Sequence, residues 1–560
     1  MPLTGAMFIG AERRQGTGPA VRSADPRTDE PLEPPYAAGG AREVDDACAR
    51  AASAALRYRS VPPAERAAFL ERIADRIEEL GDELVDRAVA ESGLPRGRIS
   101  GERDRTTAQL RLFAEEVRAG EWAEVRVDPA PPAGRRTAGP DLRQRHLAVG
   151  PVAVFGASNF PLAFSVAGGD TAAALAAGCP VVVKGHQAHL GTCELVGSAV
   201  AAAARDQGLP EGVFSLLFGA GSDLGQALVA DPRIRAVGFT GSQSGGLALM
   251  RTAAARPVPI PVYAEMSSVN PVFLLPGALR ERAGELAEGF TASLTLGAGQ
   301  FCTNPGLVIA VAGADLDRFV ASASAAVGRS TGQTMLTSGI HRAYERATAA
   351  LRAGEGVREI ATGLPGEGEN TATVRLLTVA ADDFLKDPGL QEEAFGAAST
   401  LVVCRDGGQL TRVARALRGQ LTTTVHHGEG DGTTAAGLLP VLEDMAGRVL
   451  FDGWPTGVEV SHAMVHGGPF PATSDGRTTS VGTLAMRRFL RPVCYQNLPA
   501  GLLPPELSDD NPYGLPRRTD GVRTDGAGAD GTGTDGAGTD GAGARNPAVR
   551  PVGPMITGAG

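Results

Sequence analysis

The sequence predicts an α/β protein in which helices cover two parallel sheets. Two observations support this prediction: short apolar strands alternate with helical runs from residue 147 to 264, and the alternation starts again at 271 and continues to about 450. Near-continuous apolar strands in such an alternation are typical of parallel sheets with both faces covered. At roughly 150 residues per domain, a chain of 560 residues has room for several domains. We therefore expect two Rossmann-like domains that bind ligands at the carboxyl ends of their strands.

Helices are expected ahead of the first sheet. Apolar residues such as Phe69, Ile73, Ile77 and Leu84 recur at three- and four-residue steps within 63–91, which predicts an amphipathic helix there. A second amphipathic helix is expected at about 103–117. The Pro- and Arg-rich segment that ends near residue 145 predicts a connecting arm or hairpin.

The expected elements of the two sheets follow in order. The first sheet is assigned strands at 152–156, 181–184, 213–218, 236–239 and 260–264, with helices at 162–177, 190–207 and 221–230. The second is assigned strands at 272–275, 307–311, 400–404, 421–426 and 448–451, and the segment 487–503 predicts an edge strand. After residue 509 the chain is a near-repeat of Asp, Gly, Thr and Ala that cannot bury enough apolar area to offset chain entropy, so a disordered tail is expected.

Composition argues against several classes of protein. A net charge of −10, from 53 basic and 63 acidic residues, does not fit a nucleic-acid-binding protein, which would present a basic face. No signal peptide is recognised, and polar residues and prolines break the most apolar stretch, 151–183, so no membrane span is expected. Six cysteines without a close C-x-x-C pair fit a reducing compartment, and we expect a cytoplasmic protein.

Cys302 is the first candidate for chemistry. It lies in LGAGQFCTNPG, a turn of small residues between an expected helix and an expected strand, and such a turn suits a thiol presented as a nucleophile. The alternative is a buried structural cysteine, which is the commoner role of a lone cysteine. Cys48, Cys179 and Cys404 adjoin apolar segments and fit that structural role.

Polar residues follow the buried strands of the first sheet. Glu265, at the end of IPVYAE, can act as a general base with a pKa raised by desolvation, although a solvated glutamate fits the same position. The amide of Asn159, in FGASNFP, can donate to a developing oxyanion, or it is an ordinary turn asparagine. Thr240, Gly241 and Ser242 open a helix where backbone N–H groups favour phosphate, which alone is weak evidence.

Lys184 and two histidine pairs have unusual contexts. Only two of the 53 basic residues are lysines, and Lys184 directly follows the apolar run VVV, where a compact cation needs a physical reason. The spacings of His186/His189 and His462/His466 suit a metal, but the second pair lacks the glutamate of H-E-x-x-H and no third ligand is evident. We therefore expect no metal site.

Together these residues resemble the aldehyde dehydrogenase superfamily. The motifs SNFP (158–161), VVVK (181–184), GFTGS (238–242), AEM (264–266), GQFC (299–302) and EEAFG (392–396) occur in the family's order and at comparable spacing, and the resemblance covers roughly residues 3–506. The stretches PTGVEVSHAMVHGGPFPATSDGRTTSVG and RFLRPVCYQNLP are similar to the α-ketoglutaric semialdehyde (2,5-dioxovalerate) dehydrogenase branch.

The resemblance implies a domain layout and an assembly. Residues 1–128 and 148–265 would bind the cofactor, and 266–485 would form the catalytic domain. Residues 129–147 and 486–506 would supply an oligomerisation arm and strand, which implies a homodimer or homotetramer, and 507–560 would be the disordered tail.

The resemblance also implies a mechanism. The Cys302 thiolate attacks the aldehyde, and the Asn159 amide with the backbone N–H of Cys302 holds the oxyanion. Hydride passes to the nicotinamide of NADP or NAD, and Glu265 then activates the water that hydrolyses the thioester. The implied reaction is oxidation of an aldehyde to a carboxylic acid, with 2,5-dioxovalerate giving 2-oxoglutarate.

The family's cofactor contacts map onto this sequence as well. Lys184 would bind the adenosine ribose, Glu393 the nicotinamide ribose, Phe395 would lie against the nicotinamide, and the turn 240–242 would lie near the pyrophosphate. Gln187 stands where NAD-preferring members often carry a glutamate, and because a glutamine does not repel a 2′-phosphate, NADP is expected to be accepted. The common motif E-L-G-G is EMSS here (265–268), and the asparagine often found before the cysteine loop is absent.

Two other reactions stay open. Transfer of the acyl group to coenzyme A is disfavoured by Glu265, because a base poised for water is not needed when a thiol is the acceptor. A thiol esterase without redox chemistry is disfavoured by Lys184 and the 240–242 turn. The implied substrate carries a carboxylate, so some arginine should face the pocket, and Arg477 in SDGRTTS is only a guess.

Overall fold

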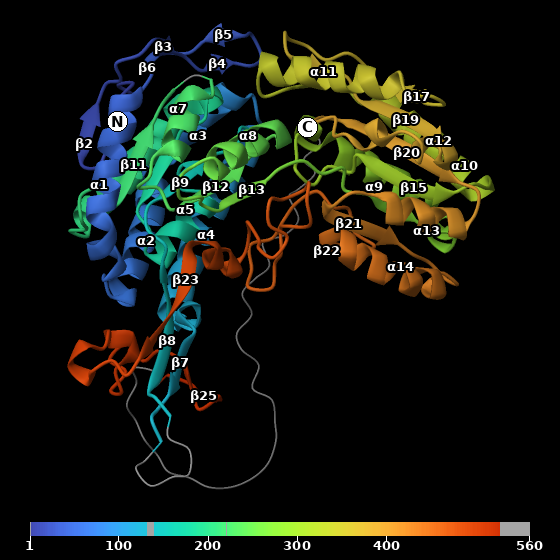
Figure 1. The fold of residues 1–560 in the computed structure, drawn as a ribbon. Helices are drawn as coiled ribbons and strands as arrows, with labels where there is room; N and C mark the ends of the chain where they lie inside the picture. Colours follow the sequence, from blue (N-terminus) through green and yellow to red (C-terminus); the bar gives the residue numbers. More distant parts are fainter. Residues whose placement is uncertain (1, 132–138, 220, 527–560) are drawn as a thin grey trace.

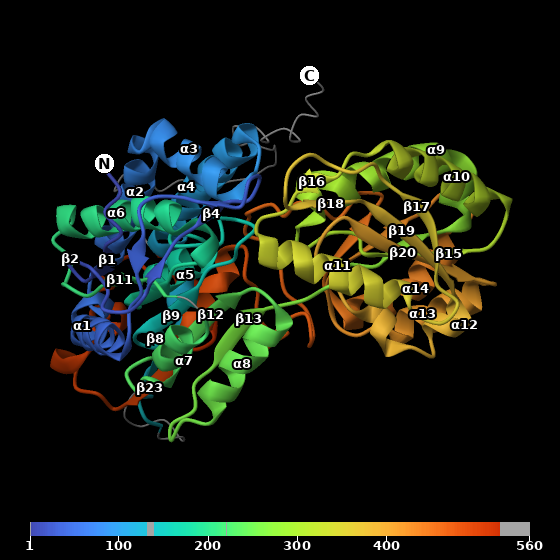
Figure 2. The same cartoon turned by 90° about the horizontal axis from the view of Figure 1, so that it is seen from above.

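A computed structural model describes residues 2–131, 139–219 and 221–526 of the chain. Two α/β domains lie side by side, and a narrow arm formed by β7, β8 and β23 extends away from the first of them (Figure 1). Figure 2 shows the two domains from above, with β9, β12 and β13 in one and β15, β19 and β20 in the other. The expected α/β fold with two largely parallel sheets is confirmed.

The first domain is built on a seven-stranded sheet with the order β13-β12-β9-β10-β11-β1-β2. The five predicted strands are parallel, so their carboxyl ends meet at one edge. Two short antiparallel strands, which sequence reasoning did not identify, extend the other side. The strands are β1 (Met7–Ile9), β2 (Glu12–Arg14), β9 (Val152–Phe155), β10 (Val181–Lys184), β11 (Phe214–Leu217), β12 (Ala236–Thr240) and β13 (Val262–Glu265).

Helices pack on both faces of this sheet and share one continuous apolar core with it. They are α1 (Ala41–Arg59), α2 (Pro63–Glu79), α3 (Gly81–Ser92), α4 (Arg96–Ala119), α5 (Gly169–Ala177), α6 (Leu190–Asp206), α7 (Asp223–Ala230) and α8 (Gln243–Ala254). The helix expected over 63–91 is two helices, because Gly81 adopts a φ of 54° that glycine tolerates and a helix does not. The helix expected at 162–177 begins only at Gly169, and residues 161–168 form turns, with the N–H groups of Leu162 and Ala163 donating to buried Glu102.

The second domain has a seven-stranded sheet with the order β17-β19-β20-β15-β14-β21-β22, in which only β17 is antiparallel. One face packs on α9 and α10 and the other on α13 and α14, which gives two apolar clusters. The strands are β14 (Val272–Leu274), β15 (Leu307–Val311), β17 (Arg358–Thr362), β19 (Arg375–Ala380), β20 (Ala398–Cys404), β21 (Gln420–His426) and β22 (Ala446–Phe451). The helices are α9 (Pro276–Thr295), α10 (Ala314–Arg329), α11 (Ser338–Arg352), α12 (Ala381–Phe384), α13 (Gly407–Ala416) and α14 (Gly432–Met445).

The arm is a five-stranded sheet with the order β23-β8-β7-β24-β25. As expected for an arm and a terminal edge strand, β23 (Leu490–Gln496) pairs antiparallel with β8 (Leu142–Ala148) along its whole length. The inner strand β7 (Val125–Asp128) pairs on its other side with β24.

The structure corrects the start of the disordered tail expected at 507–560. Residues 507–526 are described and ordered into the arm: Leu507 and Leu515 are buried, β24 (Arg517–Thr519) pairs in parallel with β7, and β25 (Val522–Thr524) returns beside it. This segment has the large apolar residues that the Asp-Gly repeat lacks. Residues 527–560, the rest of the expected tail, lie outside the described residues. No helix in the described part of the chain is both long and apolar enough to cross a membrane.

Candidate active site

Cys302 lies in a tight loop between the two domains' sheets. After α9, residues 297–299 adopt φ values of 56°, 59° and 70°, all in the left-handed region. A Cβ on Gly299 would lie 2.4 Å from the backbone nitrogen of Ala397, so glycine is required where the loop packs on its neighbour. On the other side, the Asn270 amide donates to the carbonyl oxygen of Cys302 at 2.9 Å. The backbone around the thiol is therefore fixed from two directions.

Two further side chains that can exchange protons meet at this thiol. Sγ of Cys302 lies 3.3 Å from Nε2 of His466, and the same nitrogen lies 2.9 Å from Oε1 of Glu265. The other carboxylate oxygen accepts a hydrogen bond of 2.5 Å from Oγ of Ser480. Nδ1 of His466 is buried and has no hydrogen-bond partner among the described residues. The tautomer that fits carries its hydrogen on Nε2, where it can donate to the carboxylate or to the sulfur.

The charges of this cluster are set by burial and by its members. Desolvation, followed by the nearby charge of Glu265, raises the pKa of the Cys302 thiol well above its ordinary value. Burial also opposes ionisation of Glu265, but attraction to His466 and the hydrogen bonds from His466 and Ser480 outweigh it, so its pKa is lowered. This corrects the raised pKa expected for Glu265. The resting site holds a neutral thiol beside an ionised carboxylate.

Asn159 reaches the cysteine loop from the first domain. It follows β9 and is buried, and its Nδ2 donates to the backbone carbonyl of Gln300 at 3.0 Å, two residues before Cys302. The side-chain amide therefore lies against the loop that carries the Cys302 thiol.

Glu393 approaches the thiol from the second domain. Its charge contributes to the raised pKa of the Cys302 thiol, after burial and the charge of Glu265. Burial raises the pKa of Glu393 itself to about 7. Glu393 and Phe395 line one small pocket together with Gly299 of the cysteine loop. Cys302, Glu265, Asn159 and Glu393 are thus brought together by the fold.

The serines that replace two family glycines take part in this arrangement. Ser267 Oγ donates to Oε2 of Glu393 at 2.5 Å, and Ser268 Oγ donates to Oε1 of Gln420 at 2.9 Å. The backbone path after Glu265, which the motif alone left uncertain, is fixed by these hydroxyls.

The turn 240–242 adjoins the cluster through the first sheet. Thr240 pairs in register with Glu265, and the N–H of Gly241 donates to the Glu265 carbonyl at 3.1 Å. Ser242 caps α8, since its Oγ accepts from the N–H of Gly245 at 3.3 Å. The N-terminus of a twelve-residue helix is therefore exposed at the same edge as the base.

Lys184 and Gln187 lie farther along that edge. Lys184 ends β10, which β9 separates from β12. Burial lowers the pKa of Lys184, and its ammonium group makes no hydrogen bond or ion pair with any described residue. Gln187 is exposed on the short 3-10 helix that follows. Neither residue contacts the Cys302 cluster.

His466 is the site residue that sequence reasoning missed. The pair His462/His466 is split by the fold: the His462 side chain is 67% exposed beside Glu116, whereas His466 is fully buried between Cys302 and Glu265. Spacing in sequence carried no sign of this, because the partners of His466 are more than 160 residues away.

The guess of Arg477 for a substrate carboxylate is wrong. Its side chain is 89% exposed and pairs with neighbouring Asp475 at 2.8 Å, so it does not face the site. His189, of the other histidine pair, is satisfied by the carbonyl of Ala157 at 3.0 Å and by the Cys193 sulfur at 3.3 Å.

Comparison with known proteins agrees with this geometry. Residues 14–423 match the model of the aldehyde dehydrogenase family. The chain belongs to the aldehyde dehydrogenase family. This aldehyde dehydrogenase is 54% identical over 522 residues to an α-ketoglutaric semialdehyde dehydrogenase of Azospirillum brasilense. The alignment covers 93% of this chain and 99% of the relative. A relative of the same name from Acinetobacter baylyi is 46% identical over 92% of this chain and 98% of its own length. The resemblance noted from the motifs is confirmed.

Solved structures show the same fold at lower identity. A 1-pyrroline-5-carboxylate dehydrogenase from Thermus, with bound NAD, superposes on this aldehyde dehydrogenase with a TM-score of 0.75 at 21% identity, over 88% of this chain and 92% of the other. A 3,6-anhydro-L-galactose dehydrogenase in complex with NAP gives 0.74 at 21% identity, over 88% and 99%.

Proposed function

We propose that this enzyme oxidises 2,5-dioxovalerate, the α-ketoglutaric semialdehyde, to 2-oxoglutarate with NADP or NAD. The observation that carries the proposal is the cluster of Cys302, His466 and Glu265, whose reactive atoms lie within 4.8 Å of one another. The substrate is inferred from the two relatives of that name, which align with nearly the whole of this chain. A thiol beside a carboxylate suits acylation followed by hydrolysis.

The residues at the edge of the first sheet fit a dinucleotide. Lys184 is a half-buried cation without a described partner, which suits a ribose hydroxyl or a phosphate. The N-terminus of α8 suits the pyrophosphate, and Glu393 suits the ribose next to the nicotinamide. Gln187 carries no charge that would repel a 2′-phosphate, so we expect NADP to be accepted. When bound, the nicotinamide accepts the hydride that leaves the reacting carbon.

The protein's own groups provide the acylation chemistry. Glu265 takes the proton of the Cys302 thiol, and the Nε2–H of His466 then donates to the new thiolate instead of to the neutralised carboxyl. The thiolate attacks the aldehyde carbon. Nδ2 of Asn159 and the backbone N–H of Cys302 donate to the resulting oxyanion.

The same carboxylate serves the second half of the reaction. Once the thioester has formed, Glu265 loses its proton to solvent and is held again by His466 and Ser480. It then removes a proton from the water that attacks the thioester, and the acid is released. Because Glu265 is the base in both acylation and hydrolysis, the Cys302 sulfur and the attacking water must occupy the position next to its carboxylate at different stages of the reaction.

A panel of aldehydes assayed at 340 nm with both cofactors tests the proposal. We expect the highest kcat/KM with 2,5-dioxovalerate and 2-oxoglutarate as its product. Cys302→Ala should abolish oxidation and leave cofactor binding intact, with Cys404→Ala, at a buried cysteine of β20, as the matched control. Turnover retained in Cys302→Ala would refute the nucleophile, and a neutral aldehyde preferred over all acidic ones would refute the substrate.

We also infer that the arm assembles the enzyme into a homodimer or homotetramer. The inference is supported by β23, whose outer edge has no neighbouring strand in the described chain. Analytical ultracentrifugation tests it, and a monomer at assay concentration would contradict it.

A further inference from the structure

Helix α4 lines the approach to the thiol with one charged face. Arg98, Glu102 and Arg105 are spaced at i, i+4 and i+7, so they share that face of α4. The helix packs on the loop that follows Asn159, because Oε1 of Glu102 accepts from the N–H groups of Leu162 and Ala163 at 2.8 and 3.0 Å. The face of α4 that carries the two guanidinium groups is thereby held against the loop that contains Asn159.

Arg98 fixes this helix to the cysteine loop. Its Nη2 donates to the carbonyl of Asn159 at 2.9 Å. Its guanidinium lies 4.8 Å from the ring centre of Phe160 and 4.4 Å from that of Phe301, the residue before Cys302. Arg98 therefore positions the Asn159 loop through one hydrogen bond and through its contacts with two aromatic rings.

Arg105 is left with unused capacity. Its guanidinium lies 5.2 Å from the ring of Phe164, and Nη2 makes a long contact of 3.4 Å with the carbonyl of Val458. Its Nη1 is buried and has no partner among the described residues. Neither Arg105 nor Arg98 forms an ion pair with a carboxylate in the described part of the chain, although the Glu102 carboxylate, three residues before Arg105 on α4, is the largest attractive charge acting on the Arg105 guanidinium. The contact with Phe164, five residues after Asn159, places Arg105 beside the same loop.

An unpaired guanidinium beside the nucleophile suits one kind of substrate. Arg105 is half-buried, and a buried guanidinium nitrogen without a hydrogen-bond partner, such as its Nη1, costs stability unless a bound anion accepts from it. Guanidinium binds carboxylate through paired N–H donors, and such charge-assisted bonds are strong where water is excluded. Arg448, which also lies near the thiol, spends Nη1 on the carbonyl of Gly457 at 2.8 Å and Nη2 on that of Pro455 at 3.3 Å, so it is less free to bind an anion.

We propose that Arg105 binds the carboxylate of the aldehyde substrate, so that this enzyme selects aldehydes with a carboxylate at the far end of a short chain. The proposal rests on the proposed function and names the residue that gives it substrate specificity. Arg98 holds the neighbouring aromatic wall and the Asn159 loop in place, and Arg105 supplies the free donors.

The test compares two aldehydes of equal length that differ in charge. Succinic semialdehyde carries a carboxylate and butanal does not, and kcat/KM is measured for both with wild type, Arg105→Met and Arg111→Met. Arg111 lies on the same helix, but it is exposed and paired with Glu78 and Asp75, so it is the matched control. In Arg105→Met we expect the acid-to-neutral ratio of kcat/KM to fall about 100-fold, mainly through KM. The ratio should be unchanged in Arg111→Met.

Each outcome decides one point. An unchanged ratio in Arg105→Met, or an equal loss with both aldehydes, overturns the role of Arg105. A wild-type enzyme without preference for the acidic aldehyde overturns the proposed substrate instead. If Arg105→Met fails to fold, Arg105→Lys decides, because it keeps the charge and loses the paired donors: the ratio should fall about tenfold, and an unchanged ratio counts against the proposal.

Discussion

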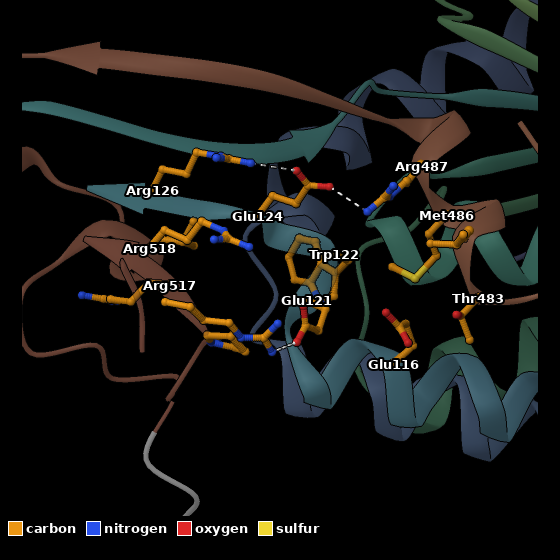
Figure 3. Close-up of a pocket in the computed structure, with 14 residues that line it drawn as sticks. Glu116, Glu121, Trp122, Glu124, Arg126, Thr483, Met486, Arg487, Arg517 and Arg518 are labelled. Atoms are coloured by element: carbon orange, nitrogen blue, oxygen red, sulfur yellow. Dashed lines mark hydrogen bonds and ion pairs between the residues drawn. The ribbon is translucent and has the colours of Figure 1, made fainter. Parts of the chain in front are cut away.

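Helix α4 has charged side chains in two regions of the molecule, the cavity beside the arm and the loop that contains Asn159, and these side chains have different partners. Near its C-terminal end, Glu116 borders a cavity of about 350 Å³ between the arm and the first domain, and arginines from several elements converge there (Figure 3). Three of them are paired: Glu124 meets Arg487 at 2.9 Å and Arg126 at 3.8 Å, and Glu121 pairs with Arg523. A fourth, Arg517, donates to the backbone carbonyls of Ser508 and Glu506. In the N-terminal half of α4, Arg98 and Arg105 lie against the Asn159 loop and form no ion pair with a described carboxylate.

The contrast separates charges that serve structure from charges that serve chemistry. Partly exposed ion pairs contribute little each, about 1 kcal/mol or less, and are tolerant of change. A buried cation or thiol without a partner is costly, and proteins keep such groups at functional sites. Substitutions at the catalytic end of this comparison should therefore change rates, and substitutions in the arm should change stability only slightly.

Glu265→Gln should have the largest effect. It removes the base for both halves of the reaction, so steady-state turnover is expected to fall about 100-fold or more. The substitution also removes the charge that helps to raise the pKa of Cys302, so the pH at which iodoacetamide alkylates that thiol should move down. Both are measured in a Cys494→Ser background. Unchanged turnover would contradict the role of Glu265 as the base, and with it the distinction between charges at the active site and charges in the arm.

His466→Asn should have the next largest effect. The variant loses the Nε2–H that stabilises the thiolate, so the rate of the first hydride transfer should fall about 10- to 100-fold, and less so at high pH. Stopped-flow absorbance at 340 nm measures it. His462→Asn is the matched control, with a rate within about twofold of wild type. Equal effects from the two histidines would contradict the role of His466.

Cofactor binding should depend on pH through Glu393. Its pKa is about 7, and the ionised form is the one that accepts hydrogen bonds from ribose hydroxyls. Protonation below pH 7 removes that acceptor, so the Kd for NADPH should rise about tenfold between pH 8 and pH 6. Fluorescence titration checks this, and Glu393→Gln should bind more weakly at pH 8 and show a flat profile. A flat profile in wild type would count against the contact.

Glu124→Gln in the arm should have the smallest effect. It breaks two partly exposed ion pairs, with Arg487 and Arg126, so the free energy of unfolding should fall by less than about 1 kcal/mol. Chemical denaturation measures this, and kcat/KM should stay as in wild type. A large loss of activity would show that the ion pairs of Glu124 in the cavity influence the active site.

Much of the fold follows from local patterns in the chain. Buried parallel strands such as β9 and β10 are continuous apolar runs, so their positions are legible in sequence. The edge strands β2, β17 and β25 are not, because short edge strands need neither apolar runs nor alternation. Gly81 divides one periodic stretch into two helices, since periodicity does not report a left-handed residue.

Only part of the site can be predicted from the sequence, because local motifs mark some of its residues and not others. Cys302, Glu265 and Asn159 lie in local motifs at strand ends and loops, where sequence context marks them. His466 and Arg105 act through partners that the fold brings from far along the chain, and each lies in a segment with no chemical signature of its own. The lowered pKa of Glu265 was equally out of reach, because it depends on His466.

The pairing of β24 with β7 has a consequence for self-association. On that side the sheet ends in β25, which is three residues long with every side chain exposed and Arg523 at its centre. A border so short and charged is a poor template for another chain. The other edge of the described arm sheet, the seven-residue strand β23, is better suited to pair with a second copy of the chain. When the same edge of two copies pairs, the contact is symmetric, so it forms a closed dimer and does not propagate into a filament.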